Sequence, residues 1–350
     1  MLVDSPPEQS ADTASPATPR RRGTLRAAGL LVSVAVLLLV CVASIAAGAK
    51  SVPPAEVWHG LFHSTGTGND VVVAEVRLPR TVLGLLVGAA LGLAGAVMQA
   101  LTRNPLAEPG LLGVNAGAAA AVVSAISFLG VTSITGYVWF AFFGAAVVSV
   151  LVYALGGSRA ATPVRLALVG TAATAVLYGY VNAVQLLDSA ALDRLRFWTV
   201  GSLASADMAT AGKVWPFIAA GVVIALLIAR PLNAMEMGDD TARALGARLT
   251  RTRLLAMVSV TLLCGAATAA CGPIVFIGLM VPHLVQTITG PDLRWILPYA
   301  AVLSPVLLLG ADVAGRIVAR PSELQAGIVT ALIGGPVFIH LVRRKRTAQL

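Results

Sequence analysis

Apolar residues run along this chain in unbroken stretches of about 17 to 22 residues, separated by short polar segments. A helix of that length crosses a hydrocarbon core about 30 Å thick. A membrane β-strand would instead alternate apolar and polar residues over about ten positions. These stretches do not alternate and are rich in Ala, Leu, Val and Gly. We therefore predict an all-α, polytopic integral membrane protein with about ten transmembrane helices.

The predicted transmembrane domain covers residues 27–345 and lies between two cytoplasmic tails, 1–26 and 346–350. The first tail is rich in Pro, Ser, Thr and acidic residues, and we expect it to be disordered. The apolar stretch that follows is longer than the roughly 7 to 15 residues of a signal peptide, so we expect it to stay as an uncleaved helix. The spans are predicted near residues 27–48, 81–102, 111–130, 134–155, 166–187, 213–229, 254–271, 273–290, 295–313 and 326–342.

Composition adds to this picture by excluding other classes of protein. With 57% hydrophobic and 12% charged residues and a mean hydropathy of +0.85, the chain holds more apolar surface than one soluble core could bury. The net charge of +9 comes mostly from loops and termini, so it does not indicate a nucleic-acid partner.

Ten spans place both termini on one side of the membrane. The loops of that side hold about 17 Lys and Arg against about 8 opposite, which predicts cytoplasmic termini.

The chain lacks the motifs of the common enzyme classes. It has no GxxxxGK[ST] phosphate-binding loop, no HExxH helix and no Ser/His/Asp arrangement. Its four histidines are scattered, and Cys41, Cys264 and Cys271 have no CxxC spacing. We therefore predict no catalytic residue, no metal site and no cofactor in this chain, and a membrane enzyme is disfavoured. Span centres that are nearly free of charge also disfavour a proton-coupled secondary transporter.

The longest predicted cytoplasmic connection runs from Arg230 to Arg253, and its middle carries charges of both signs. Asp239 and Asp240 stand where the dipole of a short helix favours acids, and Gly246 stands where such a helix would end. We interpret this segment as a docking element for a partner protein on the cytoplasmic face. A solvated connector that only joins two spans is the alternative.

Several ordered segments closely resemble the FecCD-type permeases of iron(III)-siderophore, haem and vitamin B12 importers. One such segment alone would be weak, but in this order, joined by the predicted spans, they are specific. The resemblance covers nearly all of residues 27–345. The segments are Arg77 to Arg80, Gly95 to Gly117, Trp198 with Gly201 to Leu203, Leu232 to Gly246, Gly272 to His283, and Glu323 to Gly334.

The resemblance implies a ten-helix, vitamin B12 permease-like subunit of the bacterial inner membrane. Such a subunit works in a pair with an identical or related permease, together with two cytoplasmic ATPase subunits and an external siderophore-binding protein. ATP and Mg would bind to the ATPase subunits and not to this chain. Iron(III)-siderophore complexes are the commonest cargo of the family and are the cargo we expect. Vitamin B12 and haem remain alternatives, because permeases for all three share these motifs.

The resemblance also implies roles for individual residues on the cytoplasmic side. The coupling region, about residues 231–250, would sit in a cleft of the ATPase, with contacts from Gly238, Asp239, Asp240, Arg243, Leu245 and Gly246. The cytoplasmic gate would involve Asn104, Leu106, Thr162, Pro163 and Val164. This chain departs from the vitamin B12 permease at the second gate segment, where that permease has adjacent small hydroxyl residues and this chain has Pro163 and Val164.

On the predicted outer face, Arg77, Arg80 and Arg316 stand out because positive charge is otherwise depleted there. In the resembling importers, arginines at these positions meet glutamates of the external binding protein. A guanidinium suits that role because it binds a carboxylate bidentately and stays charged. We therefore expect these three residues to dock the binding protein. Snorkelling toward the phosphates of membrane lipid is the alternative.

Overall fold

The computed structural model describes residues 19–48, 52–63, 68–131, 133–156 and 163–347. These residues are mostly helical, and none of them forms a strand. The elements are α1 (Pro19–Ala46), α2 (Pro54–Phe62), α3 (Asn69–Val71), the π-helix η1 (Val72–Arg77), α4 (Leu78–Thr102), the 3-10 helix η2 (Pro109–Leu112), α5 (Val114–Leu129), α6 (Ile134–Leu155), α7 (Pro163–Leu187), α8 (Ser189–Trp198), α9 (Met208–Glu236), α10 (Asp239–Ala244), α11 (Leu249–Cys271), α12 (Ile277–Thr289), α13 (Leu293–Val318) and α14 (Ala326–Thr347).

Every predicted span coincides with an apolar helix: α1, α4, α5, α6, α7, α9, α11, α12, α13 or α14. Within the described part of the chain, seven of these are long and apolar enough to cross a membrane, and α5, α12 and the apolar part of α14 are shorter. Helix α1 begins inside the predicted tail, and α14 continues past residue 345. Residues 1–18 and 348–350 lie outside the described residues, so the disorder expected of the first tail stays a prediction.

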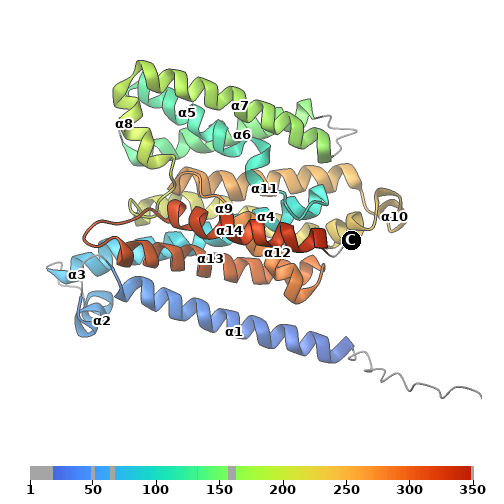
Figure 1. Ribbon diagram of the computed structural model, residues 1–350, viewed down its shortest axis with the longest axis horizontal. Helices are drawn as coiled ribbons and strands as arrows, with labels where there is room; N and C mark the ends of the chain where they lie inside the picture. The colour runs from blue at the N-terminus through green and yellow to red at the C-terminus, as the bar shows by residue number, and fades with distance from the viewer. Residues whose placement is uncertain (1–18, 49–51, 64–67, 132, 157–162, 348–350) are drawn as a thin grey trace, which may run out of the picture.

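Helices α4, α9, α11 and α13 form the centre of the bundle, and the other spans surround them (Figure 1). Helix α4 packs against α13, α11, α9 and α12, and 78% of its apolar window is buried. Helices α5, α6 and α7 pack together on one side of this centre, and α1 packs against α13 on another (Figure 1). Only 6% of the α1 window and 17% of the α7 window are buried, so both helices present apolar surface to lipid or to a partner.

Most of the spans run along one long axis, so the bundle has two ends (Figure 1). The α10 end holds α10, the α4–α5 loop at residues 103–108 and the turn before α13. The α2 end holds α2, α3 and α8 (Figure 1). The short helix predicted in the coupling region is confirmed as α10, with Asp239 and Asp240 in its first turn and Gly246 just beyond it at φ 82°.

Glycines let α4 approach its neighbours closely. A Cβ at Gly95 would overlap the carbonyl oxygen of Gly278 in α12, and a Cβ at Gly92 would overlap the hydroxyl of Ser304 in α13. Such close approach matters in a membrane, because apolar lipid gives transmembrane helices little hydrophobic reason to associate and van der Waals packing has to hold them together. Small residues on one face of α4 thus place it at the centre of the bundle.

A non-helical segment, residues 272–276, separates α11 from α12 within the apolar part of the chain. Protein groups satisfy the backbone around this break. The Cys271 carbonyl accepts from the backbone N–H of Ser202 at 2.8 Å, and the Glu108 carboxylate accepts from the backbone N–H of Phe276 at 3.2 Å. Non-helical backbone is tolerated at membrane depth only with such partners, because hydrocarbon supplies none.

We expect Gly95→Ala to destabilise the bundle, because the new methyl group has no room beside the Gly278 carbonyl. Overpacking of this kind costs about 1 to 3 kcal/mol. The thermal unfolding midpoint of purified protein measures the effect. Gly310→Ala is the matched control: Gly310 lies in α13 with no atom within 4 Å of a built Cβ, so the midpoint should hold or rise. Equal midpoints for the two variants would contradict the close approach.

Candidate functional site

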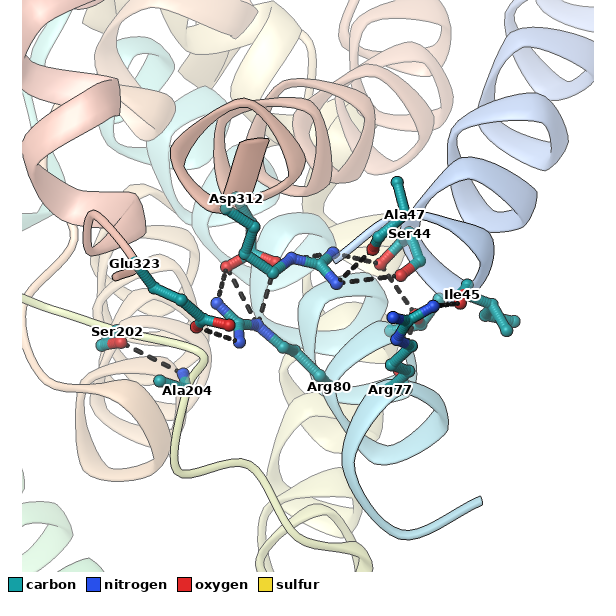
Figure 2. Close-up of polar contacts among 11 residues, drawn as sticks. Ser44, Ile45, Ala47, Arg77, Arg80, Ser202, Ala204, Asp312 and Glu323 are labelled. Atoms are coloured by element: carbon teal, nitrogen blue, oxygen red, sulfur yellow. Dashed lines mark hydrogen bonds and ion pairs between the residues drawn. The ribbon is translucent and has the colours of Figure 1, made fainter. Parts of the chain in front are cut away.

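At the α2 end, a cluster of charged side chains ties neighbouring helices together (Figure 2). The Arg80 guanidinium of α4 donates to the Asp312 carboxylate of α13 from Nε at 3.0 Å and from Nη2 at 2.7 Å. Its Nη1 donates to Glu323 at 2.7 Å, and Arg316 contacts Asp312 at 3.1 Å. Arg80, Asp312 and Arg316 are each 3% exposed or less. Buried charges persist only when they are paired and hydrogen-bonded, so these side chains act as one unit.

The same cluster caps the C-terminal end of α1. Arg316 donates to the carbonyl oxygen of Ser44 at 3.0 Å, and Arg77 donates to those of the next two residues at 2.9 and 2.7 Å. The last carbonyls of a helix have no partner within it, and the C-terminal end of the helix dipole attracts cations. The two arginines therefore satisfy the end of α1 and hold it against α4 and α13 (Figure 2).

The three predicted docking residues all belong to this cluster or border it. The sequence predicts guanidinium groups presented at the outer face, whereas Arg77, Arg80 and Arg316 are buried and donate to groups of their own chain. In this structure the carbonyls of α1 and the carboxylates of Asp312 and Glu323 already accept from these guanidinium groups. Snorkelling toward lipid phosphates would need the same exposure. Docking to an external protein stays a prediction.

The residues predicted for the gate fall in two segments. Asn104 and Leu106 lie in the exposed α4–α5 loop, where the Asn104 side chain accepts from the backbone N–H of Leu106 at 3.0 Å. Val164 lies in the first turn of α7 and is 75% exposed. Thr162 lies outside the described residues, and the side chain of Pro163 is not among those described. Their role as a gate stays a prediction.

Glu108, at the end of the α4–α5 loop, has no role in the sequence-based prediction. Its carboxylate accepts from the backbone N–H of Phe276, at the N-terminal end of α12. The amide groups and the dipole at a helix N-terminus favour a negative charge. Glu108 therefore links the predicted gate loop to the break between α11 and α12. The sequence did contain a sign of this role, because Glu108 is a single acid in an otherwise apolar stretch. An unpaired carboxylate in a membrane carries a high free-energy cost, so a partner was to be expected.

At the α10 end, Asp239 joins α10 to two neighbouring elements. Its carboxylate pairs with Arg103 of the α4–α5 loop and with Arg253 of α11, the latter at 2.7 Å. Partial burial raises the pKa of Asp239, but hydrogen bonds from Arg103 and Arg253 outweigh burial and hold that pKa below its usual range. Asp239 is therefore an internal link, a role that the sequence did not predict. Its contact with an ATPase stays a prediction.

The other predicted coupling residues face outward or shape the turns around α10. Asp240 is 98% and Arg243 63% exposed, and the two pair at 2.8 Å. Leu245 is 64% exposed. Gly238 and Gly246 have φ values of 111° and 82°, which favour glycine. The exposed Leu245, just after α10, thus lies beside an ion pair at the end of the bundle.

An open cleft of about 600 Å³ is lined by α5, α7, α14 and the break after α11. Most of its lining is apolar, including Pro273, Val275 and Leu332. Asn115 and Tyr178 are among its few polar side chains. The break that Glu108 helps to hold therefore forms part of the wall of this cleft.

We expect Asp312→Asn to destabilise the fold, because it leaves the buried Arg80 and Arg316 without their shared carboxylate. Breaking a buried ion pair costs about 3 to 5 kcal/mol. Asp193→Asn is the matched control and should cost less than about 1 kcal/mol, since Asp193 is 68% exposed and pairs with Arg196 at 3.5 Å. Unfolding midpoints of the two purified variants measure the difference. Small and similar shifts in both would show that the cluster does not hold the helices.

Known proteins are similar to this chain in sequence and in fold. The ferric enterobactin transport system permease protein FepD of Escherichia coli (strain K12) is 47% identical over 89% of this chain and 93% of its own length. The hemin transport system permease protein HmuU of Yersinia pestis is 36% identical over 89% of this chain and 94% of its own. A solved ABC transporter described as of the metal-chelate type, in an inward-facing conformation, has a TM-score of 0.78 at 26% identity and covers 90% of this chain and 98% of its own.

A family model described as the FecCD transport family matches residues 36–344, which include nearly every apolar helix described above. This match agrees with the ordered motifs from Arg77 to Gly334 and with the all-helical bundle that joins them. The chain therefore belongs to the FecCD transport family.

Proposed function

We propose that this chain is the membrane-spanning permease subunit of an ATP-binding cassette importer that carries iron(III)-siderophore complexes into the cytoplasm. The observation that carries the proposal is the 47% identity, over nearly the full length of both chains, to a permease named for ferric enterobactin transport. The sequence has no phosphate-binding loop, which fits a subunit that leaves ATP and Mg to a separate ATPase. The relative named for hemin transport supports haem as the second candidate cargo.

Transport in this proposal is mechanical and involves no covalent chemistry. Two permease subunits would enclose a path, and the apolar cleft along α5, α7 and α14 would contribute to its wall. Few polar groups in that wall let a bulky chelate pass without being held. The siderophore already supplies the ligands of the iron, so the path needs none. ATP-driven closure of the ATPase subunits would switch the side on which the path opens.

The proposal places the α10 end in the cytoplasm, in line with the excess of Lys and Arg in the loops of that side. Exposed Leu245, beside the Asp240–Arg243 pair, would then meet the ATPase. The α2 end would face the external binding protein. Arg80 is 3% exposed and pairs with Glu323, whose side chain is 34% exposed, so docking through this arginine requires that pair to rearrange.

The cargo is tested by uptake of radioiron-labelled ferric enterobactin and of labelled haem. The host is a strain that lacks its own permeases for both and expresses this chain with its ATPase and binding protein. We expect ATP-dependent uptake of the ferric siderophore above a strain that lacks the chain. Uptake of haem alone would replace the proposed cargo with the second candidate. Uptake that survives ATP depletion would instead support a proton-coupled carrier.

The coupling role is tested by Leu245→Asp, which puts a charge on the most exposed apolar side chain next to α10. We expect co-purification of the ATPase and siderophore uptake to fall at least about tenfold, the loss of one buried anchor in an interface. The unfolding midpoint should stay as in wild type. Leu192→Asp is the control: Leu192 is also exposed, at 44%, but lies on α8 at the other end, so it should not affect ATPase binding. Normal co-purification of Leu245→Asp would exclude this contact.

A further inference from the structure

A groove of about 210 Å³ lies between α6 and α11 and belongs to none of the sites above. Phe142, Ser149 and Tyr153 of α6 line one wall, and Leu254 and Val258 of α11 line the other. Leu254 is 48% and Val258 39% exposed, so the groove is open to the surroundings of the bundle. Both walls belong to membrane-spanning helices, and those surroundings are hydrocarbon.

The groove has the length of one leaflet of a membrane. Phe142 and Tyr153 are about 11 residues apart on one helix, or about 16 Å. Half of a hydrocarbon core is about 15 Å. Tyr153 lies close to the end of α6, where Tyr is typical of the membrane interface. At the deep end, the Phe142 ring packs on Phe217 with 4.5 Å between ring centroids. One acyl chain of a lipid therefore fits along the groove.

A cation stands beyond the shallow end of this groove. Arg251 lies in the first turn of α11, three residues before Leu254 and seven before Val258, which places it on the same face of the helix. It is exposed and forms no ion pair with any residue that the structure describes. Arg253, by contrast, is paired with Asp239. A cation at this depth attracts the phosphate of an anionic lipid headgroup.

We propose that this groove is a specific binding site for an anionic phospholipid in the leaflet at the α10 end. The phosphate pairs with Arg251, and one acyl chain lies between α6 and α11. A zwitterionic lipid would fill the same groove but gain less from Arg251, because its headgroup carries a compensating cation. The match of groove length to one leaflet, with a cation above it, favours lipid over a second protein chain as the occupant.

The test is native mass spectrometry of the full-length protein, released from nanodiscs that contain equimolar phosphatidylglycerol and phosphatidylcholine. Wild type is expected to retain phosphatidylglycerol preferentially. Arg251→Gln should reduce that preference about fivefold, the effect of one basic residue near an anionic surface. Arg196→Gln removes an exposed cation from α8 at the other end and should keep the preference. Equal retention of the two lipids by wild type would overturn the proposal.

The groove itself is tested by filling it from either wall. Val258→Trp fills it from α11, and Ser149→Leu fills it from α6, where the Ser149 hydroxyl has no hydrogen-bond partner among the described residues. Either variant should lower retention of both lipids. Val223→Trp adds the same bulk to an exposed position of α9 and should not.

Unfolding midpoints show which of these variants fold. One folded variant, either Val258→Trp or Ser149→Leu, is enough to test whether lipid binds in the groove. Unchanged lipid retention in a folded groove variant would overturn the proposal. So would a Val258→Cys variant that crosslinks two copies of the chain, because the groove would then be a contact between permease subunits.

Discussion

Polar groups that hydrocarbon cannot satisfy set the arrangement of this bundle. Asp312 accepts from Arg80 of α4 and also pairs with Arg316 of its own helix, and Arg316 and Arg77 in turn satisfy the last carbonyls of α1. In water each of these groups would find other partners at little cost. Inside a membrane an unpaired charge or carbonyl costs several kcal/mol, so the helices that carry the partners are held together.

The backbone at the break between α11 and α12 also needs polar partners within the protein. One of these partners connects the break to α10 through the α4–α5 loop. Asp239 of α10 pairs with Arg103 at the start of the α4–α5 loop. Glu108 at the end of that loop accepts from the backbone of Phe276 at the break. A short run of contacts thus links the exposed helix α10 to a wall of the apolar cleft. A movement of α10 at the proposed ATPase contact could therefore be passed through these contacts to the wall of the proposed path.

The outer surface of the bundle follows a different rule, because lipid satisfies apolar groups as well as protein does. Helix α1 is largely exposed along its length, and polar contacts hold both of its ends to the bundle. The arginines cap its C-terminal end, and the Tyr299 hydroxyl of α13 donates to the Arg26 carbonyl near its N-terminal end. The groove between α6 and α11 is a hollow in this apolar surface, and Arg251 above it adds a charge. A preference for an anionic over a zwitterionic lipid arises there from the headgroup, since the acyl chains of both are apolar.

The sequence by itself determined the spans, because an apolar stretch long enough to cross a membrane must be helical to satisfy its own backbone. It also determined α10, because the acids that favour its first turn and the glycines that flank it lie within a few residues of one another. Helices α2 and α8 were missed, because short polar or mixed segments carry too little periodicity. Only the tertiary structure decided the environment of the arginines, since Arg80 and Asp312 are 232 positions apart and Glu108 and Phe276 are 168 apart. Whether an arginine is exposed or buried depends on such distant partners, and no local pattern encodes them.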